Sequence, residues 1–330
     1  MPVSGLPPGG SCHTAGVSGN LTSELPVVAV VGATATGKSD LGVALARVLG
    51  GEVVNADASQ LYRGMDVGTA KLTEAQRQGV PHHQLDVLDV REEASVAAYQ
   101  QAARADLAAI RGRGHVPVVV GGSGLYVRAL LDRLEIPPTD PVVRQRWEAE
   151  LEAAGVASLY AHLGRVDPEA AARIEPRNGR RIVRALEVIE LTGRPFSATL
   201  PRREHAVPTV QLGLSAERPV LDERIARRVD RMWEQGLVAE VEKLAGQGLR
   251  DGRTASRAIG YAQVLALLDG EITEEVARED TVTATRRLVR RQESWFGPDP
   301  RTTWLPHDAD DLLDQALATV RTGGSNPEDR

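Results

Sequence analysis

The sequence predicts an α/β protein with a P-loop parallel-sheet core covered by helices and an all-helical insertion domain. Three observations predict this fold. Short β-branched runs alternate with helical stretches between residues 26 and 126, and that order indicates parallel strands with helices over them. A glycine-rich phosphate-loop motif directly follows the first run. Between residues 128 and 201 the β-runs disappear and only helical patterns remain.

The composition is that of a globular protein with a sizeable core. Of 330 residues, 42% are hydrophobic and 25% are charged, which sets aside the disordered and collagen-like classes. No run approaches the roughly 18 apolar residues of a membrane-spanning helix, so we expect a cytoplasmic protein with no membrane partner. The single cysteine, Cys12, excludes an intrachain disulfide and a multi-cysteine zinc site. The net charge of −6, taken alone, argues mildly against a nucleic-acid partner.

The first part of the core spans residues 25–127. It follows residues 1–24, which are rich in Gly, Pro, Ser and Thr and are predicted to be a disordered leader. The apolar run at residues 27–31 predicts a buried strand, and helical spacing follows at residues 40–49. Two more strands are predicted at residues 52–55 and 116–120.

The helical insertion spans residues 128–201, with helices predicted at residues 141–154, 157–166, 168–174 and 178–192. The second part of the core spans residues 202–321 and begins with a strand at residues 210–214. A long helix follows, with one apolar face made by Leu221, Ile225, Val229, Met232, Trp233 and Leu237. Trp233 is therefore predicted to be a core residue. Residues 322–330 are predicted to be a disordered tail.

The residues after the first strand fit the phosphate-loop pattern G-x4-G-K-[ST]; they are Gly32, Ala33, Thr34, Ala35, Thr36, Gly37, Lys38 and Ser39. Glycines let backbone N–H groups surround phosphate oxygens, and the N-terminus of the following helix adds its positive dipole end. Lys38 supplies a point charge for the terminal phosphates, and the Ser39 hydroxyl can hold Mg²⁺. The motif predicts binding of a di- or triphosphate and does not specify ATP.

An ATPase would also need an acidic residue at the end of a neighbouring strand to hold the metal. The predicted strand at residues 116–120 runs instead into Gly121-Gly122-Ser123-Gly124. Asp57, shortly after the strand at residues 52–55, is the acid that closely follows a strand run. Its position at the carboxyl end of a parallel strand fits a metal ligand, a general base or a structural cap equally well.

Taken together, several stretches of the chain resemble the tRNA dimethylallyltransferase family; they are residues 32–39, 57–71, 121–126, 168–174, 180–187, 224–230, 258–261 and 290–296. The resemblance covers roughly residues 26–305. It implies transfer of the five-carbon group of dimethylallyl diphosphate to N6 of adenosine 37, just 3′ of the tRNA anticodon. The phosphate loop would then hold the diphosphate of the prenyl donor, which agrees with the missing strand-end carboxylate.

The same resemblance implies roles for individual residues. Asp57 would be the general base, and Lys38, Ser123 and Arg224 would complete the catalytic set, with Mg²⁺ at Ser39. The positions expected to meet the tRNA anticodon stem-loop are Asp57, Ala58, Ser59, Gln60, Ser123, Arg144, Arg180, Arg181, Arg184, Arg257, Gly260, Tyr261 and Trp295. Ser123 and Ser294 stand where the family usually has threonine, and both keep the hydroxyl. Ala262 stands where the family commonly has a basic residue, so a contact there is expected to be weaker or replaced.

Positive charge is concentrated in two segments of this net acidic chain. Residues 171–205 contain eight arginines and four glutamates, and residues 286–291 contain four arginines and no acid. Helical spacing puts the members of each cluster on one side of a helix; they are Arg180, Arg181 and Arg184, and Arg287, Arg290 and Arg291. For one cluster alone, a solvated helix face is the simpler interpretation. Two such faces favour contacts with RNA phosphates.

Three other functions stay open on the sequence. A P-loop small-molecule kinase would need the strand-end carboxylate that is not seen. An adenylate isopentenyltransferase, acting on AMP, ADP or ATP, would not need an arginine-rich helical insertion. An RNA-binding module without catalysis would leave the phosphate loop unexplained. We further expect a monomer, and a packed or hydrogen-bonded pair at His82 and His83 without a metal site.

Overall fold

The computed structural model describes residues 26–199 and 203–323, in which six strands form one parallel sheet of order β3-β2-β4-β1-β5-β6. The strands are β1 (Val27–Gly32), β2 (Gly51–Asn55), β3 (His82–His83), β4 (Val116–Val120), β5 (Thr209–Ser215) and β6 (Thr302–Pro306). The predicted parallel sheet is thus confirmed. The predicted leader, with Cys12, lies outside the described residues, as does the predicted tail beyond Gly323.

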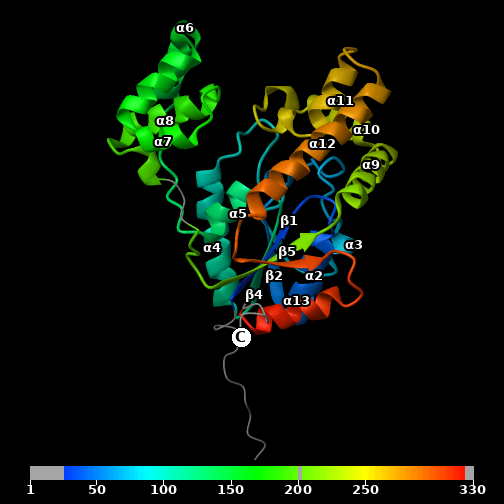
Figure 1. The fold of residues 1–330 in the computed structure, drawn as a ribbon. Helices are drawn as coiled ribbons and strands as arrows, with labels where there is room; N and C mark the ends of the chain where they lie inside the picture. The colour runs from blue at the N-terminus through cyan, green and yellow to red at the C-terminus, as the bar shows by residue number, and fades with distance from the viewer. Residues whose placement is uncertain (1–25, 200–202, 324–330) are drawn as a thin grey trace, which may run out of the picture.

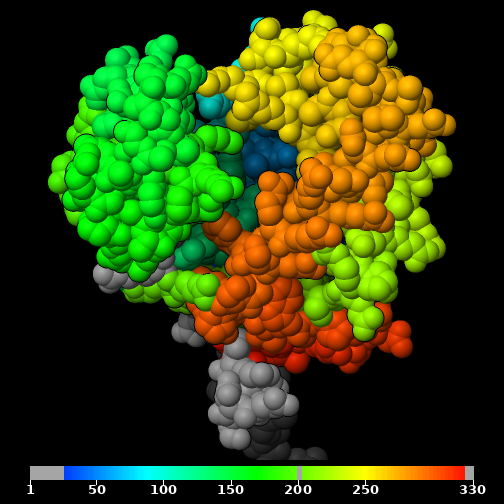
Figure 2. Space-filling view, turned by 45° about the horizontal axis from the view of Figure 1, so that its top comes forward, coloured from blue at the N-terminus to red at the C-terminus, as the bar shows by residue number. Residues whose placement is uncertain are grey.

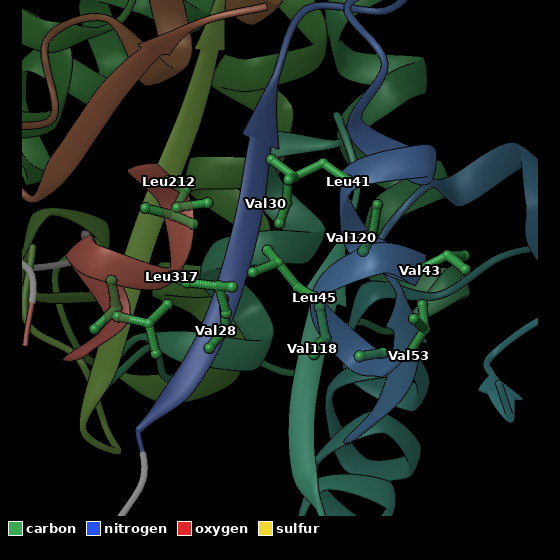
Figure 3. Packing of buried hydrophobic residues seen from close by; sticks show 14 of the residues in the cluster. Val28, Val30, Leu41, Val43, Leu45, Val53, Val118, Val120, Leu212 and Leu317 are labelled. Atoms are coloured by element: carbon green, nitrogen blue, oxygen red, sulfur yellow. The ribbon is translucent and has the colours of Figure 1, made fainter. Parts of the chain in front are cut away.

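Helices cover both faces of the sheet because successive strand residues point to opposite sides. Val28 and Val30 of β1 face α2 (Lys38–Leu49) and α13 (Leu312–Arg321), as Figure 3 shows. Val27, Ala29 and Val31 of the same strand face α4 (Val96–Gly112) and α5 (Gly124–Leu131). All six residues of β1 are buried, which is the burial expected of a central parallel strand.

Two strands were not predicted from the sequence. β3 has only two residues, too short for a periodic pattern. β6 lies at the edge of the sheet and is only partly buried, so it has no continuous apolar run. The predicted histidine pair lies in β3: His83 Nε2 bonds the Glu52 carboxylate over 2.6 Å, and His82 Nδ1 bonds the Val80 carbonyl over 2.8 Å. This confirms the hydrogen-bonded pair.

The insertion consists of α6 (Pro141–Val166), α7 (Pro168–Arg173), α8 (Gly179–Thr192) and the short η2 (Phe196–Thr199). It has its own core, which includes Leu159, Leu163, Ile182 and Leu186. The chain bends sharply at Gly155, whose φ of 79° is non-helical, in agreement with the two helices predicted there. Its start differs from the prediction at residue 128, because α5 continues to Leu131 and packs into the core of the sheet domain.

A third group of helices lies across the sheet edge from the insertion (Figure 1). It contains α9 (Arg218–Glu234), α10 (Leu237–Ala245), α11 (Tyr261–Leu268) and α12 (Glu274–Phe296), with the smaller elements η3 (Leu249–Asp251) and η4 (Ala255–Arg257). The predicted helix through Leu237 is broken at Gly236, where φ is +91°, so Leu237 begins α10. Trp233 is 7% exposed within this group, which confirms it as a core residue.

Two short helices complete the first half of the chain. They are η1 (Ala58–Leu61), which directly follows Asp57, and α3 (Glu74–Arg77). Among the described helices, none combines the length and the apolar character needed to cross a membrane. Because all the strands are parallel, the loops after β1, β2, β4 and β5 meet at one edge of the sheet, between the insertion and the α9–α12 group.

Candidate active site

The phosphate loop connects β1 to α2 in the expected strand-loop-helix arrangement. Ala35 and Gly37 adopt positive φ values of 65° and 93°, which turn the backbone around the loop. Inside the loop, the Thr36 hydroxyl donates to the Ala33 carbonyl over 2.8 Å, and the Lys38 amine donates to the same oxygen. α2 begins at Lys38, so its free N–H groups point into the loop.

The electrostatics of Lys38 bring two further residues into the site. Burial, with the nearby Arg228 guanidinium, lowers the pKa of Lys38 to about 8, while the Asp57 carboxylate opposes this shift. Burial also lowers the pKa of Arg228, and Asp57 again opposes the change. Asp57 and Arg228 thus belong to the electrostatic environment of Lys38. Arg228 was not predicted, although it lies one turn beyond Arg224 on α9, and that spacing was its signal.

Asp57 follows β2 and is fixed by its neighbours. Its Oδ1 accepts the Ser59 N–H over 3.0 Å and caps η1, and its own N–H donates to Asn55 Oδ1 over 3.0 Å. Ser123, after β4, accepts the Ala58 N–H over 3.1 Å. The structural-cap interpretation of Asp57 is thus observed. Its second oxygen, Oδ2, has no hydrogen-bond partner within the described chain and is free for a ligand.

Glycines after β4 let α12 and the end of β2 approach closely. A Cβ on Gly121 would lie 2.3 Å from the Ala56 carbonyl, and one on Gly124 would lie 2.1 Å from the Trp295 ring. Gln292 of α12 links two site loops, since its Oε1 accepts the Thr34 N–H over 2.9 Å and its Nε2 donates to Gly122 over 3.1 Å. Gln292 lies in the stretch at residues 290–296 that resembles the family, but its bridging contacts were not predicted, because its partner Thr34 lies 258 residues away.

Arg224 and Arg228 on α9 reach the site from the other side. Arg224 is exposed, and its Nε donates to the Ala35 carbonyl of the phosphate loop over 2.6 Å. Arg228 is half-buried, and its Nη2 donates to the Thr69 carbonyl over 3.1 Å. The structure therefore brings Lys38 and Arg224 to the phosphate loop, while Arg228, one turn further along α9, binds the Thr69 carbonyl and acts on the charge of Lys38.

The space above these residues is a hollow. Figure 2 shows it between the green insertion and the yellow and orange helices, with dark blue residues from the N-terminal part of the chain at its floor. Trp295, 40% exposed, lies against Gly124. Arg257 is also exposed, at the end of η4. Both side chains are therefore accessible to a large substrate.

Tyr261 corrects one prediction. Its side chain is fully buried, and its hydroxyl donates to Glu240 Oε1 over 2.5 Å. Gly260 is buried as well, with a φ of +91° at the start of α11. A buried ring cannot stack on a nucleobase, so the Tyr261 side chain is a packing residue in this structure. The motif at residues 258–261 was interpreted as an RNA contact because its sequence carries no information about burial.

The arginines of the insertion divide into two kinds. Arg180 and Arg181 at the start of α8 are exposed and make no side-chain hydrogen bond within the described chain. Arg144 and Arg184 instead bind the fully buried carboxylate of Glu187 over 2.6 Å and 2.8 Å. Burial would raise the pKa of Glu187, but these arginines and Thr139 together lower it to about 2. Arg144 and Arg184 are thus partly committed to holding α6 against α8.

In the described residues, no group of three or more His, Cys, Asp or Glu side chains is arranged so that it could hold a metal ion. Ser39, in the first turn of α2, offers a hydroxyl oxygen with no hydrogen-bond partner in the described chain. Mg²⁺ prefers oxygen ligands and usually takes several of them from phosphates and water. The donor set therefore fits a magnesium ion carried by a phosphorylated ligand.

The fold defines an α/β protein with a six-stranded parallel sheet between helices, and the loop after β1 carries the phosphate-loop sequence. The chain belongs to the IPP transferase family, whose model matches residues 60–299. It is 63% identical over 299 residues to a protein from Thermobifida fusca named tRNA dimethylallyltransferase, covering 89% of this chain and 94% of that one. A protein of the same name from Kineococcus radiotolerans is 62% identical over 299 residues, with 88% and 94% covered.

Solved structures agree. The tRNA isopentenylpyrophosphate transferase of Bacillus halodurans is 39% identical, with a TM-score of 0.67 over 91% of this chain and 98% of that one. A eukaryotic dimethylallyltransferase acting on tRNA is 27% identical, with a TM-score of 0.75 over 89% and 77% of the two chains. The family expected from the sequence is therefore confirmed.

Proposed function

We propose that this protein transfers the dimethylallyl group of dimethylallyl diphosphate to N6 of adenosine 37 in tRNA. The observation that carries the proposal is that Lys38 and Arg224 both donate to carbonyls of the phosphate loop, while Asp57 is fixed after β2 at the same edge of the sheet. Arg228 and Asp57 also act on the charge of Lys38. A diphosphate needs the two cations, and an acceptor amine needs the carboxylate. The names of the similar proteins support both the donor group and the tRNA acceptor.

The leaving diphosphate gains negative charge as its bond to carbon breaks. Backbone N–H groups at the start of α2, Lys38 and the arginines of α9 would stabilise that charge, because they are held in place before the reaction begins. Arg224 and Arg228 offer planar guanidinium groups that suit phosphate oxygens. Ser39 would hold Mg²⁺ together with phosphate oxygens, and the ion would add further positive charge when bound.

The acceptor chemistry falls to Asp57. As the N6 nitrogen of adenine forms its bond to C1 of the prenyl group, the carbon–oxygen bond to diphosphate breaks and the nitrogen loses a proton. Oδ2 of Asp57 would accept that proton, while Oδ1 would stay bound to the Ser59 N–H. The Ser123 hydroxyl, which accepts the Ala58 N–H, keeps its own hydrogen for the substrate.

The tRNA would lie across the hollow and present one unstacked base to its floor. Arg180 and Arg181 on one side, and Arg257 and Trp295 on the other, are exposed and suited to phosphate and base contacts. Ala58, Ser59 and Gln60 lie beside Asp57 and are half-buried at the floor. A monomer located in the cytoplasm stays a prediction.

The test is a transfer assay with labelled dimethylallyl diphosphate and Mg²⁺. Parallel reactions contain unmodified tRNA, tRNA with guanosine at position 37, and free AMP, ADP or ATP. We expect label only in the unmodified tRNA. Label in free nucleotides would favour an adenylate isopentenyltransferase, and transfer of the γ-phosphate from labelled ATP would favour a kinase. Either result would overturn the proposal.

A further inference from the structure

Glu240 of α10 binds the loop at residues 66–68, which lies more than 170 residues away in the sequence. Its Oε2 accepts the N–H groups of Asp66 and Val67 over 3.1 Å and 2.8 Å. Its Oε1 accepts the Gly68 N–H over 3.2 Å and the Tyr261 hydroxyl over 2.5 Å. The half-buried Glu240 carboxylate thus receives four hydrogen bonds, three from residues 66–68 and one from Tyr261. We call residues 66–68 the clasped segment.

The fit around Glu240 is tight on the side of Tyr261. The tyrosine ring is fully buried, and a Cβ built on Gly68 would lie 2.5 Å from it. Burial raises the pKa of Tyr261, with Glu240 acting in the same direction, so the hydroxyl stays a proton donor. The clasped segment is therefore packed against the Tyr261 ring and hydrogen-bonded to the Glu240 carboxylate, and both contacts restrict its position.

The clasped segment runs directly into Thr69, which is bonded to Arg228 of α9. The Thr69 carbonyl accepts hydrogen bonds from Arg228 Nη2 over 3.1 Å and from Gln60 Nε2 over 3.2 Å. The Thr69 hydroxyl returns to the Met65 carbonyl over 2.6 Å, so the residue is fixed relative to the segment before it. The position of Arg228 beside Lys38 therefore depends on where this carbonyl lies.

We propose that Glu240, with Tyr261, is a positioning residue that sets the place of the Arg228 guanidinium through the clasped segment and the Thr69 carbonyl. The inference rests on the proposed function, in which Arg228 binds the diphosphate. All four partners of Glu240 are donors, so an ionised carboxylate satisfies each of them. A glutamine would turn its NH₂ group toward at least one N–H and leave that donor without an acceptor.

The same loop has a second anchor that a Glu240 variant leaves intact. Lys71, with a 3% exposed side chain, binds the carboxylates of Asp66 and Asp86 over 2.6 Å each, and the Tyr62 carbonyl over 2.9 Å. The Glu240→Gln variant is therefore expected to fold, because Lys71 still binds Asp66, and the clasped segment is expected only to shift. Tyr261→Phe removes one donor and keeps the three backbone bonds, so its effect should be smaller.

The experiment compares the purified full chain with Glu240→Gln, Tyr261→Phe and Glu242→Gln. Glu242 is exposed on the same helix and serves as the matched control. We expect Glu240→Gln to raise the KM for dimethylallyl diphosphate about tenfold, with the KM for tRNA changed less than about twofold. The Kd for inorganic diphosphate should rise by the same factor. Tyr261→Phe should raise this KM and this Kd about two- to threefold, and Glu242→Gln should change neither.

A double-mutant cycle with Arg228→Lys separates an effect of Glu240 on the position of Arg228 from a general destabilisation of the site. If Glu240 acts through Arg228, its effect on the diphosphate Kd should largely vanish in the Arg228→Lys background. Additive effects, or equal rises in both KM values, would overturn the proposal. Because diphosphate binding needs no acceptor, its result stands even if tRNA proves not to be the substrate. If the wild-type protein transfers no dimethylallyl group to tRNA, that result would contradict only the proposed function.

Discussion

The backbone N–H of Thr34 donates a hydrogen bond of 2.9 Å to Oε1 of Gln292. Nε2 of the Gln292 side chain donates a second hydrogen bond to the Gly122 carbonyl over 3.1 Å. Gln292 is 6% exposed, so both bonds are shielded from water. α12 thus links the phosphate loop to the loop after β4 through Gln292, and its Val289 also packs with Ala33 of the phosphate loop.

Replacing Gln292 tests this coupling. Gln292→Ala leaves the Thr34 N–H and the Gly122 carbonyl without their partners, at a cost of about 1–3 kcal/mol. We expect a melting temperature lower by several degrees and a higher Kd for diphosphate. Calorimetry measures both, with the exposed Gln247→Ala as control. An unchanged diphosphate Kd would show that the phosphate loop keeps its shape without α12.

Asp57→Asn separates catalysis from structure. The amide oxygen can still accept the Ser59 N–H and cap η1, but it is a poor proton acceptor. We expect single-turnover transfer to fall about 10²–10⁴-fold while tRNA and diphosphate affinity change little. Full transfer activity would remove Asp57 as the base, and loss of tRNA affinity of the same size would make it a binding residue.

The pH dependence of donor binding follows from Lys38. Its pKa of about 8 lies below the ordinary value of 10.5, so the amine is charged below that pH and loses its proton above it. Diphosphate favours the charged form, so affinity should weaken as the pH rises through about 8, and binding there should take up a proton. Titrations in buffers of different ionisation enthalpy measure this uptake. Lys38→Arg, which stays charged, should flatten the profile.

The exposed arginines of α8 should act on RNA alone. We expect Arg180→Ala with Arg181→Ala to weaken tRNA binding and to reduce the salt dependence of log K by about one unit per arginine. The melting temperature and the diphosphate Kd should stay the same, because neither side chain has a partner in the described protein. A salt slope equal to that of the wild type would place the tRNA elsewhere.

Arg144→Ala should behave differently. It removes the 2.6 Å bond to the fully buried Glu187 and leaves that charge with fewer donors. We expect a loss of about 1–3 kcal/mol of stability, measured by thermal unfolding. The loss should be present at neutral pH and disappear as the pH falls from about 4.5 toward about 2, where Glu187 takes up its proton. A stability change that persists below pH 2 would contradict the role of this pair.

Short-range pattern accounts for what sequence reasoning found. The alternation of apolar runs and helical spacing predicted β1, α2, β2 and β4, because each is built from contacts within a few residues. The phosphate loop was found for the same reason. β6 was missed because an edge strand can be half-exposed, and Tyr261 was misread because a motif does not report burial. Arg228 and Gln292 lie in stretches that resemble the family, yet their contacts, like those of Glu240, were not predicted, since each acts through partners more than 150 residues away.

The sequence by itself determined the class of this protein. It indicated a loop with the phosphate-binding pattern, the absence of an acid after β4, the helical insertion and the family that carries this set of motifs. Local backbone chemistry is enough for each of these. Only the tertiary structure decided which arginines are free and which hold a buried glutamate, and that α9, α10 and α12 support the site. Those relations depend on burial and on distances between segments that no local pattern records.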